Sequence, residues 1–214
     1  MADSPRRRRK LTRELVADAA LEVGFEQLTM SRVAERLGVT HPALYHHVAD
    51  RSDLVRLAAD RVAAQVEWPP LDADWVAHLR AEAIVIFGVM VRHPGLLAAL
   101  EEADVIAEAV ATHLGDVNRH LLELGFEAEA AFLAVDLVVD LAGDSAQRAV
   151  QLLRRDESGR QRLDDLLART FDGDLGEVMA QALADGPWRW FERKLDVVLA
   201  GIEARLGPNG PADR

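Results

Sequence analysis

The stretch TMSRVAERLGVTHPALYHHVADRSDL, residues 29–54, decides the fold of the N-terminal part of the chain. Its first half predicts a short helix that begins near Ser31. Gly38 ends this helix, because glycine adopts the left-handed conformation at low steric cost. Thr40 can cap a second short helix, to about residue 48, with Pro42 in its first turn. Two short helices joined by a glycine turn predict a helix-turn-helix unit.

Helical patterns flank this stretch on both sides. Before it, apolar residues recur at helical spacing, and Gly24 ends that helix. After it, Asp50 is expected to cap a longer helix that runs to about Glu67, with Asp53 in the capping-box position. Apolar side chains of the two short helices are expected to share one core, namely Val33, Leu37, Val39, Leu44 and Val48.

Composition narrows the class of protein. Half of the 214 residues are apolar and 29% are charged, as in ordinary globular proteins. No apolar stretch approaches the roughly 20 residues that span a membrane, and no apolar segment follows the basic N-terminus as in a secretory signal. The chain has no cysteine, which excludes disulfides and thiolate metal sites. We therefore expect a cytoplasmic protein with no membrane contact, no cofactor and no metal.

The net charge of −11 is distributed unevenly along the chain. Residues 1–56 carry ten Lys and Arg against eight Asp and Glu, whereas the remainder has a net charge of −13. A basic N-terminal part joined to an acidic remainder suits a protein whose N-terminal part binds phosphate groups. The alternative is a solvated basic tail. The basic run before the first helix can reach phosphate or the minor groove as a mobile arm; it consists of Arg6, Arg7, Arg8, Arg9 and Lys10.

The rest of the chain reads as helix, because no stretch alternates apolar and polar residues. Trp68-Pro69-Pro70 is the clearest break. Further helices are expected near 74–92, 94–99, 104–124, 127–154, 161–169, 175–184 and 188–206, with loops at 155–160 and 171–173.

Residues 29–54 resemble the DNA-binding head of the tetracycline-repressor (TetR) family, most strongly in LGVTHPALYHHV followed by Arg51. The resemblance extends over roughly residues 11–60. It implies that Tyr45 and Arg51 contact phosphate. It also implies base contacts from His41, Ala43 and His46, beside Pro42 on the same outer surface, and support for docking from Thr29, Ser31 and Thr40. Two further segments resemble the first and last helices of the family's second domain, which binds ligand and dimerises. They are DADWVAHLRAEAIVIFGVMVRHPGL and WFERKLDVVLAGIEARLG.

This resemblance implies an all-α architecture with a three-helix DNA-binding domain at 1–56, a ligand-binding and dimerisation bundle at 57–207, and a disordered tail at 208–214. The resemblance also implies that the protein is a homodimeric regulator. It would act as a repressor that leaves a palindromic operator in double-stranded DNA when a small-molecule effector binds. The alternatives are a helical-bundle enzyme or an architectural DNA binder. No G-x-S-x-G, P-loop, G-x-G-x-x-G or HExxH sequence supports an enzyme.

Two histidine groups also fit a metal site, but weakly. His46 and His47 point about 100° apart on a helix, and His41 to His46 is not the i, i+4 spacing that clamps zinc. Packing of His47 against the following helix is the structural alternative. The spacing of His113, Asp116 and His120 places them on one helix face, which favours a polar surface over a metal site.

The predicted helix 127–154 is apolar nearly all round, yet Asp136, Asp140 and Asp144 recur every four residues along it. Asp136 and Asp140 can lie at a solvated rim, pair with arginines across a dimer interface, or line a pocket for a cationic or hydrogen-bond-donating effector. Glu82 would support the pocket if it faced the same cavity, and Trp75 is a further candidate.

When this chain is aligned at Trp75 with the tetracycline-binding member of the family, the resemblance places Glu82 and Ile86 where that member has an amide and a phenylalanine that bind its ligand. Tetracycline with magnesium is therefore not the expected effector.

Overall fold

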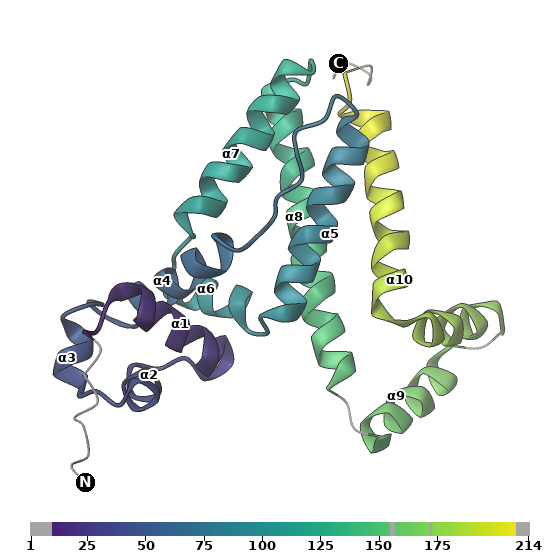
Figure 1. Cartoon of the computed structure of the whole chain (residues 1–214). Helices are drawn as coiled ribbons and strands as arrows, with labels where there is room; N and C mark the ends of the chain where they lie inside the picture. Colours follow the sequence, from purple (N-terminus) through teal and green to yellow (C-terminus); the bar gives the residue numbers. More distant parts are fainter. Residues whose placement is uncertain (1–9, 155–156, 172, 209–214) are drawn as a thin grey trace, which may run out of the picture. The chain divides into compact units, whose positions relative to one another are not determined.

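The computed structural model describes residues 10–154, 157–171 and 173–208, and these residues contain helices and no strand. The all-α prediction is thus confirmed (Figure 1). The chain forms two compact units. Unit 1 comprises residues 1–65 and 98–110, and unit 2 comprises residues 66–97 and 111–214. The predicted domain boundary after residue 56 stays a prediction.

Unit 1 contains the predicted helix-turn-helix. Its elements are α1 (Arg13–Val23), a 3-10 turn (Phe25–Gln27), α2 (Met30–Leu37), α3 (His41–Tyr45) and α4 (Arg51–Ala63). Helix α1 packs against α2 and α4, and α2 packs against α3. The expected shared core forms: Val33, Leu44 and Val48 are fully buried, and Leu37 and Val39 are half-buried.

Local signals set most of these helix ends. Gly38 ends α2 in the left-handed conformation (φ 65°, ψ 33°). Asp50 Oδ1 accepts a hydrogen bond from the Asp53 N–H at 2.8 Å, and Asp53 Oδ2 accepts from the Ala49 N–H at 3.0 Å. The reciprocal cap therefore forms with the Ala49 N–H in place of the Asp50 N–H.

Three local predictions for unit 1 are wrong in detail. Thr40 occupies the N-cap position of α3, but its side chain makes no capping hydrogen bond. Helix α3 ends at Tyr45, because the chain turns there and the His47 N–H bonds back to the Leu44 carbonyl at 2.9 Å. Helix α4 ends at Ala63 rather than Glu67, since the Gln65 N–H closes a turn on the Val62 carbonyl at 2.9 Å.

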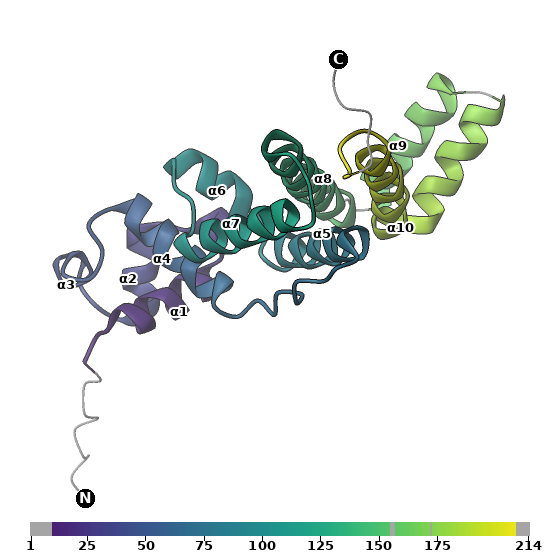
Figure 2. The ribbon, with the colours of Figure 1, turned by 90° about the horizontal axis from the view of Figure 1, so that it is seen from above.

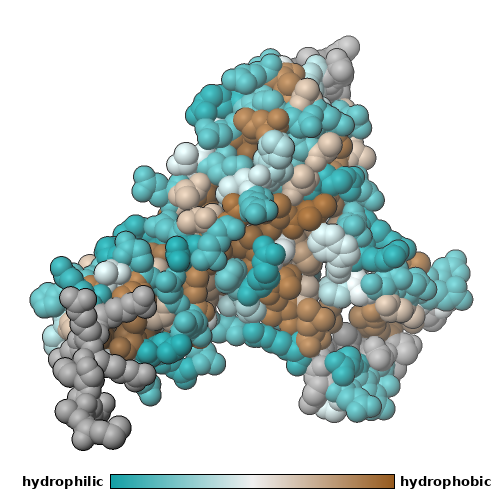
Figure 3. Space-filling view, in the orientation of Figure 1, coloured by the Kyte–Doolittle hydropathy of each residue, from teal (hydrophilic) through white to brown (hydrophobic). Residues whose placement is uncertain are grey.

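Unit 2 is a helical bundle. It contains α5 (Trp75–Arg92), α8 (Ala128–Leu153), α9 (Glu157–Thr170), α10 (Gly173–Arg205) and most of α7 (Glu108–Glu123), while α6 (Leu96–Ala103) is divided between the units. Helix α8 packs against both α5 and α10, and α5 also contacts α10 (Figure 2). The core is apolar and includes Leu79, Phe87, Val117, Leu121, Val138, Phe191, Leu195 and Leu199. Brown apolar surface also shows over the middle of this unit, around α5 (Figure 3).

The helix boundaries after residue 65 differ from the prediction at several places. Helix α6 spans Leu96–Ala103 where a helix was expected near 94–99, and Gly173, expected in a loop, begins α10. Helix α7 begins at Glu108 rather than near residue 104, because Asp104 has a left-handed backbone (φ 52°) that a helix cannot include. Residues 157–160, expected in a loop, begin α9. The break expected after residue 184 is present inside α10, where Gly186 has a φ of 83° ahead of Pro187.

No single helix among the described residues is long and apolar enough to cross a membrane; α5 and α6 reach that length and composition only as a pair bent by 89°.

Candidate functional site

Helix α3 presents polar and aromatic side chains on the surface of unit 1. Leu44 is fully buried and anchors the helix, whereas His41, Pro42 and His46 are exposed and Ala43 is half-buried. Tyr45 is 53% exposed, and its ring lies edge-on to the His41 ring with centroids 6.5 Å apart. Groups that donate and accept hydrogen bonds are thus available for contact with another molecule.

The start of α2 lies in the same unit. Thr29 is its N-cap, and Thr29 Oγ1 accepts a hydrogen bond from the Arg32 N–H at 3.2 Å. Because this bond uses only a lone pair, the Thr29 hydroxyl keeps its own proton for donation. Ser31 and Lys10 are exposed, and Arg6, Arg7, Arg8 and Arg9 lie outside the described residues.

An ionic network fixes the end of α3 relative to α1 and α4. Arg13 of α1 donates to the His47 carbonyl and forms an ion pair with Asp53 at 3.2 Å. Arg56 approaches the same carboxylate at 2.5 Å. Partial burial raises the pKa of Asp53, but the hydrogen bonds from the Ala49 N–H and Arg13 outweigh it and hold this pKa below its ordinary value.

Arg51, the predicted phosphate ligand, has partners inside unit 1. Its Nη2 lies 2.9 Å from Glu102 Oε2 on α6, and its Nε donates to the Leu28 carbonyl at 3.4 Å. The Arg51 side chain is 37% exposed and the Glu102 side chain is 69% exposed. A phosphate that contacts Arg51 therefore competes with the Glu102 carboxylate.

Unit 2 contains a buried polar cluster around Glu82. The glutamate is 2% exposed on α5, and its carboxylate accepts from His113 Nε2 of α7 at 3.0 and 2.9 Å. His78, one helical turn earlier, is also 2% exposed, with Nε2 3.7 Å from Glu82 Oε1. Together with Ser145, Glu82 and His78 are the buried polar or charged side chains of the part of the chain that the structure describes, and groups this deeply buried require partners.

Aromatic rings and an irregular segment surround this cluster. The Trp68 and His113 rings stack with centroids 4.0 Å apart, and the His78 and His120 rings meet edge-on at 5.9 Å. His78 Nδ1 lies 3.1 Å from the Pro70 carbonyl oxygen, and His120 Nε2 lies 2.7 Å from that of Asp72. Residues 66–74, which have no helix, are thereby joined to α5 and α7.

The four predicted effector contacts do not come together. Glu82 is in the buried cluster, whereas Trp75 packs edge-on against Phe126 at 5.0 Å. Asp136 and Asp140 are exposed on α8, away from the core face of that helix. Glu82 therefore does not share a buried cavity with these two aspartates.

Sequence reasoning missed three residues of the cluster: His78, Trp68 and the role of His113. The position of His78 four residues before Glu82 signals that the two share a face of α5. No local signal connects His113 or Trp68 to them, since these residues lie on other elements. Asp116 pairs with Arg119 at 2.6 Å, and the described residues contain no group of three or more acidic or histidine side chains arranged to hold a metal ion.

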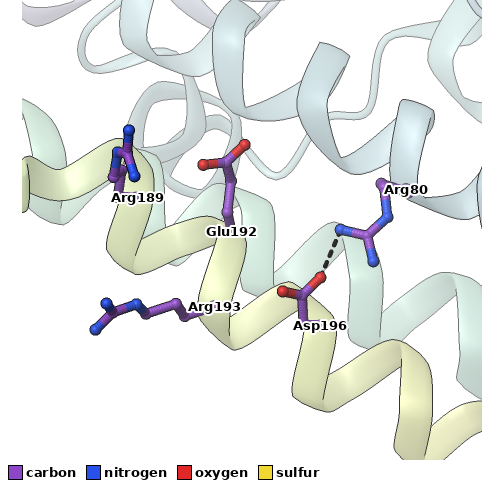
Figure 4. Close-up of a pocket in the computed structure, with 5 residues that line it drawn as sticks. All are labelled: Arg80, Arg189, Glu192, Arg193 and Asp196. Carbon is purple, nitrogen blue, oxygen red and sulfur yellow. Dashed lines mark ion pairs between the residues drawn. The ribbon is translucent and has the colours of Figure 1, made fainter.

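A second feature of unit 2 is a groove of about 300 Å³ between α5 and α10, lined by Arg80, Arg189, Glu192, Arg193 and Asp196. Figure 4 shows Arg80 and Asp196 pointing toward each other, and the two form an ion pair at 2.7 Å. Arg193 pairs with Asp185 at 3.3 Å. Sites for small organic molecules are mostly apolar, so this charged groove is a weaker effector candidate than the cluster.

Comparison with known proteins finds bacterial regulatory proteins both among family models and among individual relatives. A family model described as "Bacterial regulatory proteins, tetR family" matches residues 16–58. The tetracycline repressor protein class C of Escherichia coli is 30% identical over 207 residues, which cover 91% of this chain and 91% of the relative.

Two solved structures have a similar fold. Apo ActR from Streptomyces coelicolor has a TM-score of 0.75 at 22% identity, covering 91% of this chain and 95% of ActR. A TetR variant from Acinetobacter baumannii in complex with minocycline has a TM-score of 0.71 at 25% identity, covering 96% and 98% of the two chains. Because the similarity to the class C repressor extends over nearly the full length of both proteins, this chain belongs to the tetR family of bacterial regulatory proteins.

Proposed function

We propose that the protein is a homodimeric transcriptional repressor that reads a palindromic operator with α3 and leaves it when a small molecule binds in unit 2. The observation that carries the proposal is the exposed α3, with Leu44 buried beneath it and His41, Tyr45 and His46 outside. A short helix held this way can enter the major groove of DNA, which is about 12 Å wide.

Each exposed group has a role in this proposal. His41 and His46, beside Ala43 and Pro42, contact base edges, where ring nitrogens can donate or accept hydrogen bonds. The hydroxyls of Tyr45 and of Thr29, Ser31 and Thr40 bind phosphate and set the docking angle. Arg51 binds phosphate after it leaves Glu102, and the arm with Arg6, Arg7, Arg8, Arg9 and Lys10 adds charge that does not depend on sequence.

A second copy of the chain is the partner that the exposed apolar residues of α8 and α10 favour. Phe132 is 65% exposed, Leu133 is 40% exposed, and Val197 of α10 is 74% exposed. The two helices pack side by side, so their outer faces can form a continuous apolar surface. Burying such a surface against its symmetry mate would stabilise a dimer, and Asp136 and Asp140 would then lie at its rim.

The effector is proposed to bind near Glu82, His78 and Trp68. These side chains combine a buried carboxylate, an imidazole and aromatic surface, which is the mixture that small-molecule sites use. The minocycline complex of the Acinetobacter relative supports the idea that this fold holds a small molecule. By linkage, an effector that weakens operator binding must itself be bound more weakly by the DNA complex.

Selection of genomic DNA fragments by the purified protein, followed by footprinting of the enriched fragment, tests the proposal. We expect a protected palindrome with half-sites about one helical turn, roughly 34–36 Å, apart. Protection of a single unpaired half-site would contradict the dimeric reader. Binding that ignores sequence would favour an architectural DNA binder instead.

A further inference from the structure

We propose that His78 and Glu82 together form a receptor for a ligand group that is positively charged and donates hydrogen bonds, such as a primary ammonium. This inference rests on the proposed effector-binding role of unit 2 and names the chemistry of that effector. It follows from the arrangement of donors and acceptors in the buried cluster.

The first step is the tautomer of His78. A carbonyl oxygen only accepts hydrogen bonds, so the contact of 3.1 Å to the Pro70 carbonyl places the ring proton on Nδ1. Burial lowers the pKa of His78, and this outweighs the opposite effect of Glu82, so the ring is neutral at pH 7. The other nitrogen, Nε2, then carries a lone pair and is an acceptor.

The second step is the shortage of donors at this acceptor. His78 Nε2 is buried and has no hydrogen-bond partner among the described residues. Glu82 Oε1, which is also an acceptor, lies 3.7 Å from this nitrogen. Two acceptors therefore face each other inside the protein, where a polar atom without a partner is costly.

The third step concerns the remaining capacity of Glu82. A carboxylate offers about four acceptor positions, and among the described residues His113 Nε2 is the one hydrogen-bond donor to it, shared between the two oxygens at 3.0 and 2.9 Å. Glu82 as a whole is only 2% exposed, so bulk water does not fill the other positions. One donor placed between Glu82 and His78 would satisfy both residues at once.

These requirements select the class of ligand. A primary ammonium has three donors and no acceptor, so it can bond to Glu82 Oε1 and His78 Nε2 simultaneously. A carboxylate or phosphate brings only acceptors and negative charge, which both residues would repel. The stacked Trp68 and His113 rings add an aromatic surface close by, and such surfaces attract cations and apolar groups.

Access to the receptor runs through residues 66–74. Trp68 is only partly buried, and the segment is held to the cluster by the contacts of His78 with Pro70 and of His120 with Asp72. A segment without helix can move at the loss of few backbone hydrogen bonds. The proposed ligand enters beside the partly buried Trp68 ring.

Four small probes that differ in charge and donors test this chemistry: benzylammonium, benzyltrimethylammonium, benzyl alcohol and benzoate. Calorimetry measures their binding to the full chain, and nitrogen NMR of labelled histidine follows His78 Nε2. We expect benzylammonium to bind most tightly and to shift the Nε2 resonance toward that of a hydrogen-bonded acceptor. Benzyltrimethylammonium keeps the charge but has no donor, so it is expected to bind more weakly, and benzoate is expected not to bind.

Variants connect this binding to the two residues. Glu82→Gln should weaken benzylammonium binding about tenfold or more, because the charged acceptor is lost. His78→Asn keeps a donor for the Pro70 carbonyl but removes Nε2, and should weaken binding several-fold. Glu129→Gln, at an exposed position of α8, is the matched control and should bind like the natural protein. Circular dichroism verifies that each variant is folded.

Two results would overturn the inference: benzoate binding as tightly as benzylammonium, or benzylammonium affinity unchanged in folded Glu82→Gln. Either result leaves the operator selection untouched, so the repressor would stand with an effector of other chemistry. Conversely, ammonium binding that requires Glu82, in a protein that enriches no DNA fragment, would retain the receptor and reject the repressor.

Discussion

Arg51 Nη2 lies 2.9 Å from Glu102 Oε2, so the guanidinium proposed to bind DNA phosphate already has a carboxylate partner within unit 1. Both side chains are at least one-third exposed, and such ion pairs contribute little to stability, about 0–1 kcal/mol. A DNA phosphate can therefore replace Glu102 at small cost, and if Arg51 binds phosphate as proposed, the Glu102 carboxylate should lower the affinity of unit 1 for DNA.

Removing that competition should tighten DNA binding. Glu102→Gln is expected to raise the affinity for operator and random DNA alike by a few-fold, consistent with about 0–1 kcal/mol for an exposed pair. Fluorescence anisotropy at several salt concentrations measures the change. Glu101→Gln, the exposed neighbour, is the control and should have a smaller effect. Weaker DNA binding by Glu102→Gln would mean that the pair positions Arg51 instead of competing for it.

The proposed reading of bases by α3 and the proposed phosphate contacts predict different effects for two kinds of variant. His46→Ala should relax base preference at one operator position, with a loss of about 1–3 kcal/mol on the preferred base and little loss on random DNA. Tyr45→Phe removes only a phenolic hydroxyl and should weaken both DNAs similarly, as loss of a phosphate contact does. Competition binding with operators mutated at single base pairs provides the measurement. Equal losses on operator and random DNA for His46→Ala would reject its role as a reader.

Replacing Gly38 and Gly115 by alanine should change the free energy of unfolding in opposite directions. A Cβ at Gly38 or at Gly115 would meet no heavy atom within 4 Å, so packing does not decide either case. Gly38 has a φ of 65°, and Gly38→Ala should cost about 1–2 kcal/mol of unfolding free energy. Gly115 lies within helix α7, and Gly115→Ala should add about 0.5–1 kcal/mol. Urea unfolding monitored by circular dichroism compares them, and destabilisation by both would contradict the conformational argument.

Burial of His78 should make the protein less stable in acid. Desolvation lowers its pKa in the folded state below the ordinary value of 6.5, against an opposing effect of Glu82. The unfolded state then binds more protons, so stability is present above about pH 6.5 and is lost progressively as the pH falls below it. His78→Asn should flatten this part of the stability curve, whereas His46→Asn, at an exposed position, should not. If the free energy of unfolding falls equally steeply with decreasing pH in both variants, groups other than His78 cause the loss of stability in acid.

A charge on the outer face of α10 should separate the proposed dimer. Val197 is 74% exposed in the single chain, and Val197→Asp would bury a carboxylate if this face is the interface. Sedimentation velocity is expected to show a monomer, and operator affinity should fall because the two heads are no longer linked. Leu122→Asp on α7, where the leucine is 45% exposed, is the control and should remain a dimer. A Val197→Asp protein that stays dimeric would place the interface elsewhere.

The sequence determined unit 1 almost completely, because its signals are local. Gly24 and Gly38 end helices with positive φ, and Asp50 caps α4 through the Asp53 N–H. Each of these depends on residues within a few positions of one another, so the pattern of types alone predicts them. The helix ends that it missed include those at Tyr45, Ala63 and Glu108, which are set by turns and by the left-handed Asp104, and the local sequence has no clear signature for these.

Only the tertiary structure decided which polar residues of unit 2 meet. Glu82 was a candidate from the sequence, but its partner His113 is 31 residues away on another helix, and Trp68 approaches from a segment without helix. Asp136 and Asp140 had the more regular pattern and yet lie on the exposed side of α8. Helical spacing shows which residues share a face, but which face is buried depends on how the helices pack. For the same reason the pairing of Arg51 with Glu102, 51 residues apart, could be found only in the folded protein.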